Sequence, residues 1–274
     1  MSKQQRTVIR PRDSRKDYVR EFWDYRELLL ILTWREFKVR YKQTAIGVLW
    51  VLLRPLFTVL ILSFVFGRVA GLDTHTVPYP LMVLAGMVPW QFFSSGFTSG
   101  TNSVVADGSI ITKVYFPRII IPISAVCANL LDFLITLVLV FGLLLWYGQS
   151  FSFRVLWLLP FLLLMLFFTL GTSFFCAAWN VKYRDFRYLV PFILQFGLYL
   201  SPVGFALEKV PESYQTWFAL NPLVGIIEGF RWCLIPSWTF PAQELMVSTI
   251  GTLALFLLGL TVFHRVERQF VDII

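Results

Sequence analysis

Residues 119–146 read IIIPISAVCANLLDFLITLVLVFGLLLW, and Asp132 is their only charged residue. A helix needs about 20 predominantly apolar residues to cross the hydrocarbon core of a bilayer, so this stretch predicts a membrane-spanning helix. Of all 274 residues, 57% are hydrophobic and only 15% are charged, against about 45–50% and about 25% in soluble domains. The sequence therefore predicts an integral membrane protein and excludes a disordered chain, a secreted disulfide scaffold and a soluble enzyme.

Five other apolar runs complete a predicted set of six spans. They cover residues 44–66, 79–97, 155–179, 188–206 and 245–264. Residues 217–236 are also apolar but carry Asn221-Pro222, Glu228 and Arg231. Irregular backbone and paired charges at membrane depth need protein or water around them, so this segment is predicted to be a re-entrant periplasmic hairpin between the fifth and sixth spans.

The basic residues predict the orientation of these spans. With the N-terminus inside, 19 Lys and Arg residues lie on the cytoplasmic side and 4 on the other side. Cytoplasmic loops of membrane proteins carry such an excess, so both termini are predicted to be cytoplasmic. The predicted divisions are a basic N-terminal arm at 1–43, a membrane domain at 44–264 and a cytoplasmic tail at 265–274.

The arm carries a predicted amphipathic helix over residues 20–42. Leu30, Trp34, Phe37 and Tyr41 form one stripe at helical spacing, and basic residues gather on another face. A basic face opposite an aromatic one is typical of a helix that lies in the membrane interface, although a soluble helix packed on a partner has the same pattern. The fold class is therefore predicted as an all-α membrane protein, with six transmembrane helices preceded by an amphipathic interfacial helix.

Motifs for catalysis are scarce. The sequence has no GxxxxGK[ST] phosphate loop, no GxSxG and no HExxH, and its two histidines, His75 and His264, are isolated. We therefore expect no metal site, no cofactor and no ATP site in this chain. Asp132 and Arg54 lie within predicted spans. Intramembrane charges of this kind either pair with each other or a neighbouring helix, or bind cargo, and the sequence leaves both possibilities open.

Aromatic residues suggest a path for a sugar polymer. Trp50, Phe57, Phe196 and Tyr199 fall in the middle of predicted spans. Aromatic faces can stack on sugar rings with few directional bonds, which would let a polymer slide. The alternative is that these side chains face lipid or the protein core. Gly67–Gly71 and Gly96–Gly100 match the GxxxG spacing of close helix pairs, but both lie near segment ends and carry little weight.

Several short motifs resemble one transporter family in combination. They are residues 34–56 (WREFKVRYKQTAIGVLWVLLRPL), 86–93 (GMVPWQFF), 111–118 (ITKVYFPR), 182–185 (KYRD), Ser201-Pro202, Asn221-Pro222 and 228–231 (EGFR). The chain resembles the permease subunit of ABC-2-type exporters of bacterial surface polysaccharides, such as O-antigen and teichoic-acid exporters. Ala45 stands where that pattern usually has Ser.

The resemblance implies a function and a set of partners. Two copies of the permease would join two copies of a separate ATPase, which binds ATP and Mg²⁺. ATP hydrolysis there would drive a lipid-linked polysaccharide through the bacterial inner membrane, along a channel that the first and fifth spans form. Arg54 would meet the anionic diphosphate of the lipid carrier near the cytoplasmic entrance.

The resemblance also implies two groups of functional residues besides the aromatic path and Asp132. A cytoplasmic coupling helix between the second and third spans maps onto residues 103–117, and an N-terminal gate helix onto residues 25–42. The candidates for contact with the ATPase are Asp107, Ser109, Lys113, Tyr115, Phe116, Pro117, Lys182, Arg184 and Asp185. The gate-helix candidates are Trp34, Arg35, Phe37, Lys38, Arg40 and Tyr41.

Other functions compete with this one. A teichoic acid or a small molecule could be the cargo of the same kind of exporter. A membrane glycosyltransferase or acyltransferase would need acidic or histidine residues grouped at one membrane face, whereas this sequence offers scattered ones. A channel would need no ATPase, so an ATP-binding partner distinguishes an exporter from a channel.

Overall fold

The computed structural model describes residues 15–42, 47, 49–69, 71, 77–150, 152–183 and 185–270. Helices joined by turns and irregular loops make up these ranges, and no strand occurs in them. The helices are α1 (Arg15–Asp24), α2 (Arg26–Tyr41), α3 (Leu49–Leu62), the π-helix η1 (Ser63–Val69), α4 (Tyr79–Ala106), α5 (Gly108–Ile111), α6 (Ile120–Cys127), α7 (Asn129–Trp146), η2 (Phe153–Trp157), α8 (Leu158–Lys182), α9 (Phe186–Tyr199), η3 (Leu207–Lys209), α10 (Glu212–Ala219), α11 (Pro222–Leu234), α12 (Ala242–Val266) and η4 (Glu267–Gln269).

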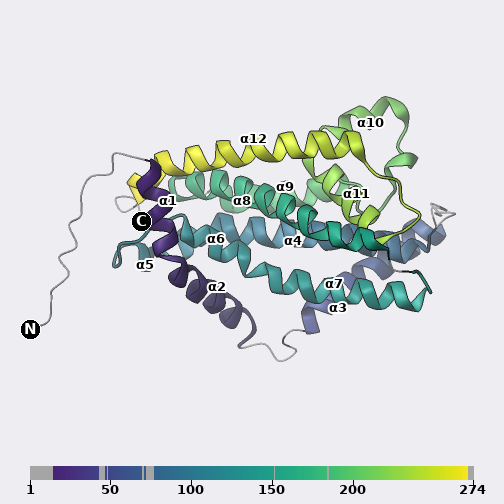
Figure 1. Cartoon of the computed structure of the whole chain (residues 1–274), viewed down its shortest axis with the longest axis horizontal. Coiled ribbons are helices and arrows are strands. Elements are labelled where there is room, and N and C mark those ends of the chain that lie inside the picture. The colour runs from purple at the N-terminus through teal and green to yellow at the C-terminus, as the bar shows by residue number, and fades with distance from the viewer. Residues whose placement is uncertain are drawn as a thin grey trace, which may run out of the picture.

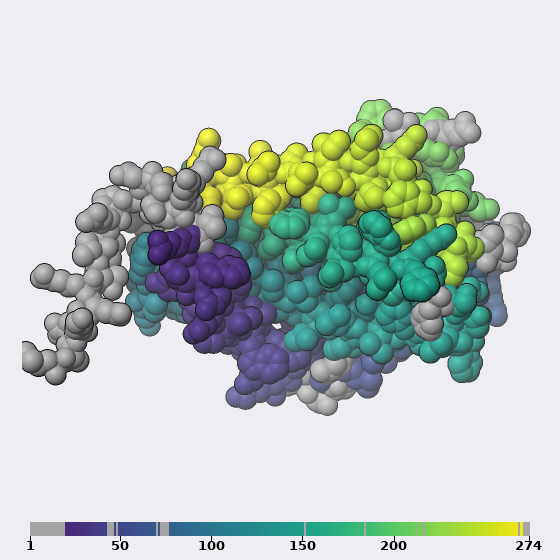
Figure 2. Space-filling model, in the orientation of Figure 1, coloured from purple at the N-terminus to yellow at the C-terminus, as the bar shows by residue number. Residues whose placement is uncertain are grey.

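The long helices form an elongated bundle (Figure 1). The helix α4 runs through its middle and is 28 residues long, and its neighbours are α3, α6, α7, α8, α9 and α11. The core therefore centres on α4, where Leu81, Met82, Val83 and Val104 have no exposed surface. The α12 helix lies along α8 on the outside of the bundle (Figure 2).

Among the described residues, four helical stretches are long and apolar enough to cross a membrane. They are Leu49–Val69, Ile120–Trp146, Phe153–Lys182 and Ala242–Val266. The other two predicted spans differ from these for physical reasons. The helix α4 is long enough, but Gly, Ser and Thr dilute its apolar character, and α9 has only 14 residues.

Two predicted spans have different bounds in the structure. The predicted run 79–97 continues as α4 to Ala106, because Thr101, Ser103 and Val104 stay buried against the bundle. The run 119–146 is divided at Ala128, where α6 ends and α7 begins. The predicted arm helix is also two helices, because α1 ends at Asp24 and α2 begins at Arg26.

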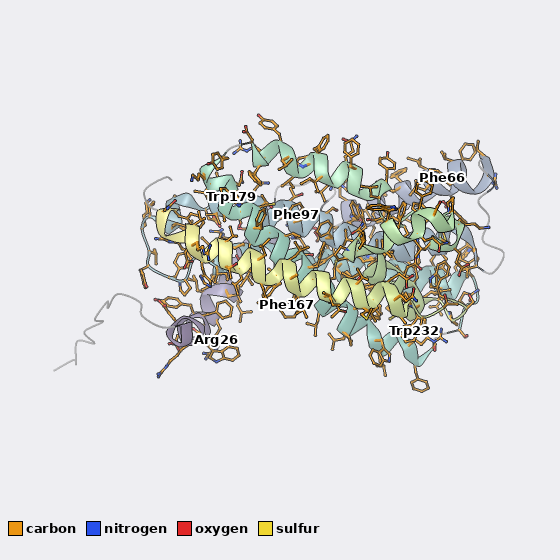
Figure 3. All side chains as sticks on the ribbon, turned by 90° about the horizontal axis from the view of Figure 1, so that it is seen from above. Arg26, Phe66, Phe97, Phe167, Trp179 and Trp232 are labelled. Atoms are coloured by element: carbon orange, nitrogen blue, oxygen red, sulfur yellow. The ribbon has the colours of Figure 1, made fainter. Side chains whose placement is uncertain are left out.

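The two ends of the bundle carry different elements. The helices α1 and α5 and the last turns of α12 lie at one end, and α10 lies at the other (Figure 1). Seen from above, Trp179 lies toward the first end and Phe66 and Trp232 toward the second (Figure 3). At the first end, Arg118 donates to the backbone carbonyl of Glu267, which ties the start of α6 to the end of α12.

The segment 217–236 folds as parts of α10 and α11. Asn221 caps α11, since its side chain accepts a hydrogen bond from the Leu223 amide. Glu228 and Arg231 form a buried ion pair at 2.8 Å, as the spacing of these residues suggested. Arg231 has no exposed surface, and it also donates to the carbonyls of Val203 and Phe205. Backbone carbonyls therefore accept the hydrogen bonds that this buried guanidinium does not donate to Glu228.

Glycines allow the closest helix contacts. A Cβ atom on Gly259 of α12 would lie 2.0 Å from the carbonyl oxygen of Gly171 on α8. Gly96 and Gly100 likewise face α8, where a Cβ on Gly100 would lie 2.6 Å from Ser173 Oγ. The expectation that the Gly96–Gly100 spacing carries little weight is therefore wrong, because this pair permits α4 to approach α8 closely.

Candidate functional site

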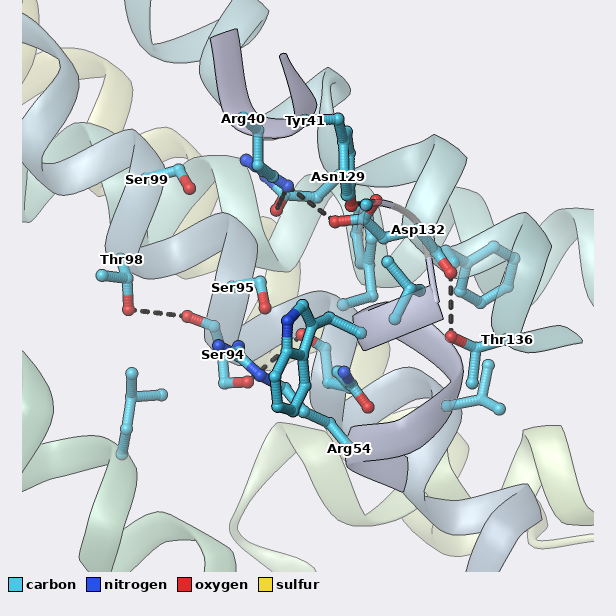
Figure 4. A pocket seen from close by; sticks show the side chains of 18 residues that line it. Arg40, Tyr41, Arg54, Ser94, Ser95, Thr98, Ser99, Asn129, Asp132 and Thr136 are labelled. Carbon is cyan, nitrogen blue, oxygen red and sulfur yellow. Dashed lines mark hydrogen bonds and ion pairs between the residues drawn. The ribbon is translucent and has the colours of Figure 1, made fainter. Parts of the chain in front are cut away.

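A pocket of about 730 Å³ opens beside the middle of α4 (Figure 4). The end of α2, the start of α3, one face of α4, the first turns of α7 and one residue of α9 surround it. The lining residues are Arg40, Tyr41, Gly47, Trp50, Val51, Arg54, Val88, Gln91, Phe92, Ser94, Ser95, Thr98, Ser99, Asn129, Asp132, Phe133, Thr136 and Leu194. The volume is in the range of about 300–1,000 Å³ that is common for small-ligand sites.

Asp132 is at the centre of a hydrogen-bonded cluster on one wall. Arg40 Nη1 lies 2.7 Å from Asp132 Oδ2 and donates to Asn129 Oδ1 at 2.9 Å. The Tyr41 hydroxyl donates to the other Asp132 oxygen. Burial, together with this hydrogen bond to a carboxylate, raises the pKa of Tyr41 above its ordinary range, so Tyr41 remains a donor at neutral pH.

The structure corrects one possible partner of Asp132. Sequence reasoning offered Arg54 or a neighbouring helix, and the cation that pairs with Asp132 is Arg40 of α2. Arg40 reaches the carboxylate because α2 ends beside the first turn of α7, whereas Arg54 lies in the second turn of α3. Asn129, which sequence reasoning did not single out, completes the cluster.

Arg54 occupies the same pocket without an ion pair to any described carboxylate. Its side chain is exposed, and Pro55 behind it is buried. Trp50, one helical turn earlier, lines the same pocket and is 46% exposed. The Arg54 guanidinium and the Trp50 indole thus border one pocket, a combination that can bind a phosphate and an apolar or sugar surface.

The other three aromatic path candidates lie outside this pocket. Phe57, Phe196 and Tyr199 are 56%, 51% and 68% exposed. The Phe196 ring packs against Phe192, with ring centroids 4.5 Å apart. Of the proposed path residues, the structure therefore brings together only Trp50 and Arg54 in one pocket, and it leaves the others on the outer faces of α3 and α9.

The coupling candidates surround the short helix α5. Asp107, just before α5, accepts a hydrogen bond from Arg35 at 2.6 Å, which joins it to α2. Ser109, Lys113 and Tyr115 are exposed. The Tyr115 carbonyl accepts from the Tyr25 hydroxyl at 3.3 Å.

Phe116 does not fit the expected role of a partner-facing anchor. Phe116 is only 5% exposed, and Pro117 beside it is buried. Its ring belongs to the hydrophobic core of the bundle, because the chain turns inward there to start α6. Tyr115 is the aromatic residue of this loop that faces outward, being 57% exposed.

The second coupling loop lies between α8 and α9. Lys182, Tyr183 and Asp185 are exposed, and Lys182 Nζ lies 5.5 Å from the centroid of the Tyr183 ring. Arg184 was also a candidate, and it lies outside the described residues. Of this loop, the exposed Lys182, Tyr183 and Asp185 are accessible to a partner.

The gate-helix candidates divide between two sides of α2. Arg35 and Arg40 lie on the side of α2 that faces the bundle, where they form ion pairs with Asp107 and Asp132. Trp34 is 53% exposed and stacks on Phe37, with ring centroids 5.4 Å apart, and Lys38 lies 5.6 Å from the Trp34 ring. Figure 2 shows α2 on the surface at the side of the bundle.

A row of polar side chains on α4 is the main feature that sequence reasoning missed. Gln91, Ser94, Ser95, Thr98 and Ser99 all line the pocket. Their steps of three and one residue place them on one helical face. That periodicity was visible in the sequence, and it could have indicated a polar surface within a predicted span. Among the described residues, no three His, Cys, Asp or Glu side chains group as metal ligands would.

Comparison with known proteins agrees with this architecture. Residues 27–235 match the family described as ABC-2 type transporter. The chain is 30% identical to the O-antigen export system permease protein RfbA of Klebsiella pneumoniae over 249 residues, which cover 90% of this chain and 95% of that one. It is 29% identical to RfbA of Myxococcus xanthus, over 93% and 98% of the two chains. It is also 25% identical to the polysialic acid transport protein KpsM of Escherichia coli, over 85% and 91%. The chain therefore belongs to the ABC-2 type transporter membrane family.

Proposed function

We propose that this chain is the permease of an ATP-driven exporter that moves a lipid-linked, O-antigen-type polysaccharide across the bacterial inner membrane. The observation that carries the proposal is the pocket beside α4, which is lined by Trp50 and by Arg54, a cation that forms no ion pair with a described carboxylate. A lipid-linked glycan joins an anionic phosphate to sugars, and this pocket offers a cation and an aromatic face side by side. Curated relatives named for O-antigen export support the same cargo class.

The proposed topology has six spans, with α4 and α9 added to the four long apolar stretches. Both termini are cytoplasmic, and α10 and α11 form a re-entrant hairpin on the far side. The position of α1, α5 and the end of α12 at one end of the bundle, opposite α10, supports this arrangement (Figure 1). The divisions are an arm at 1–43, a membrane domain at 44–264 and a tail at 265–274.

The proposed assembly is two permeases and two ATPase subunits, which bind ATP and Mg²⁺. The exposed Ser109, Lys113 and Tyr115 around α5, with Lys182 and Asp185, would contact the ATPase. The exposed aromatic side chains of α3 and α9 would line the path between the two permeases. Phe57, Phe196 and Tyr199 are exposed enough to do so.

The proposed mechanism starts with the carrier entering beside α2. Arg54 binds the diphosphate through charge-assisted hydrogen bonds, and Trp50 stacks on the adjoining sugar. Arg35 connects α2 to Asp107, next to the helix α5 that would contact the ATPase. Movement of α5 on ATP binding would therefore pull on α2, which forms one wall of the pocket through Arg40 and Tyr41.

Co-purification with an ATP-binding-cassette subunit co-expressed with this chain tests the proposal. We expect a stable complex, and we expect mass spectrometry of its extracted lipids to find an isoprenoid diphosphate linked to a repeating glycan. Arg54→Gln should lower the amount of that lipid while leaving the complex intact. A teichoic-acid polymer in its place would contradict the cargo, and a chain that binds no ATPase would contradict the exporter.

A further inference from the structure

We propose that the polar row of α4 is a binding subsite for the sugar unit next to the phosphate of the lipid-linked glycan. The polar row consists of Gln91, Ser94, Ser95, Thr98 and Ser99. This inference rests on the proposed function, and it assigns a second set of contacts in the same pocket. Arg54 would hold the phosphate, and the row would recognise the first sugar.

The row is set apart from the rest of its helix. All five side chains are half-buried and border the pocket, whereas the opposite face of α4 packs in the core through residues such as Gly96 and Gly100. Polar groups are costly at membrane depth, and those that face a cavity commonly mark a substrate path. Five polar residues on the single face that borders a cavity are therefore better explained by a polar occupant than by helix packing.

The row also has hydrogen-bonding capacity that the protein does not use. Thr98 Oγ1 donates to the Ser94 carbonyl at 2.8 Å, which leaves the hydroxyl lone pairs free. Neither Ser95 nor Ser99 has a side-chain hydrogen bond with another described residue, and no dashed line reaches either hydroxyl in Figure 4. The Gln91 side-chain amide oxygen is buried and has no hydrogen-bond partner among the described residues. A rotation of that amide toward a ligand would satisfy the oxygen.

The chemistry of the row selects a neutral, hydroxyl-rich ligand. Each serine or threonine hydroxyl can both donate and accept, as each sugar hydroxyl can. The row carries no cation, and Arg40 is already bound to Asp132 and Asn129. An anion would therefore go to Arg54, and the uncharged part of the same molecule would go to the row. Trp50 provides an apolar face for the sugar ring in the same pocket.

Binding measurements with two matched probes test this inference. The probes are farnesyl diphosphate and farnesyl diphosphate that carries one N-acetylhexosamine, titrated into the purified permease–ATPase complex in nanodiscs. The test variant is Ser95→Ala with Ser99→Ala, which removes the two hydroxyls of the row that form no side-chain hydrogen bond with another described residue. The control variant is Ser173→Ala with Ser248→Ala, because these two buried hydroxyls also have no hydrogen-bond partner among the described residues and neither lines the pocket.

We expect the Ser95/Ser99 variant to bind the sugar-bearing probe roughly tenfold more weakly, from the loss of two neutral hydrogen bonds. Its affinity for farnesyl diphosphate should not change, and the control variant should match wild type with both probes. Unchanged affinity for the sugar-bearing probe, as expected if the row holds only water, would overturn the inference. Equal loss with both probes would also overturn it, since the hydroxyls would then act on the phosphate or on the fold.

The proposed function fails in a different way. If Arg54→Gln binds both probes as tightly as wild type, the phosphate contact is wrong, and the Ser95/Ser99 comparison still decides whether α4 contacts the sugar. If wild type binds neither probe but binds a polyol-phosphate polymer, the cargo assignment is wrong. The proposed sugar subsite is then wrong as well, because it depends on that cargo.

Discussion

Arg40 and Asp132 join the last turn of α2 to the first turn of α7, with Nη1 and Oδ2 2.7 Å apart. The two side chains are 30% and 19% exposed, so the pair is partly shielded from solvent. Tyr41 and Asn129 add hydrogen bonds to the same cluster. These contacts fix the end of the amphipathic helix against the membrane domain and close one side of the pocket.

Replacing Asp132 with Asn should therefore loosen α2. The neutral amide of Asn cannot form an ion pair with Arg40. We therefore expect the free energy of unfolding to fall by about 1–3 kcal/mol, the range for hydrogen bonds to charged groups. Hydrogen exchange of residues 26–41 should become faster. Glu208→Gln is the control, because Glu208 is exposed on η3 and forms no ion pair with a described residue. Wild-type stability and exchange in Asp132→Asn would show that the pair does not hold α2.

The Arg35–Asp107 pair should connect ATP hydrolysis to movement of α2. Arg35 Nη2 lies 2.6 Å from Asp107 Oδ2 and also 2.6 Å from Glu36 Oε1, which lies on the same helix as Arg35. Asp107→Asn should lower polymer export severalfold while the complex continues to hydrolyse ATP. Glu36→Gln is the matched control, since it removes a contact within α2 and leaves the link to α5. Equal export by the two variants would contradict a coupling role for the Arg35–Asp107 pair.

The two aromatic residues before Pro117 should respond in opposite ways to truncation. Phe116→Ala leaves a cavity in the core and should cost about 3–5 kcal/mol of stability, because Phe116 is 5% exposed. Tyr115→Ala should keep normal stability and weaken the binding of the ATPase, since Tyr115 is 57% exposed. Thermal unfolding and a pull-down with the ATPase measure the two effects. A stable Phe116→Ala permease that fails to bind the ATPase would restore Phe116 as the partner contact.

The contact between α8 and α12 depends on two glycines. A Cβ on Gly259 would lie 2.0 Å from the Gly171 carbonyl oxygen, so Gly259→Ala must separate the backbones of the two helices. We expect a loss of about 1–3 kcal/mol or more, as for other overpacked sites, seen as a lower midpoint of thermal unfolding in detergent. Gly142→Ala on α7 should not lower the midpoint, because no described atom beyond its chain neighbours and the backbone of its own helix lies within 4 Å of its Cβ position. Equal midpoints for the two variants would contradict this packing.

The sequence predicted the helical membrane fold because the length of an apolar run is a local property. Runs of about 20 apolar residues are readable without knowing what they touch. The same reasoning located the Glu228–Arg231 pair, since the two residues lie one helical turn apart. It placed Trp50 and Arg54 correctly on one helix, from which both reach the same pocket.

Contacts between distant elements could not be predicted in this way. Arg40 and Asp132 are separated by 92 positions, so their pairing depends on where α2 ends in space. Whether Phe116 points toward a partner or into the core depends on the turn that starts α6. The helical spacing of the polar row of α4 was visible in the sequence. Only the structure shows that this face of α4 borders a pocket.

ATP-dependent transport in inside-out proteoliposomes tests the central claim most directly. Vesicles would contain the permease–ATPase complex and a lipid-linked O-antigen-type glycan, and the measurement is the fraction of glycan that becomes protected from an added glycosidase. We predict that ATP increases protection with wild type. We also predict that Arg54→Gln loses most of that increase, because the diphosphate loses its charge-assisted hydrogen bonds, while a Ser173→Ala control keeps it. The account would be contradicted by wild-type complex that hydrolyses ATP without protecting the glycan, or by Arg54→Gln complex that protects it at the wild-type rate.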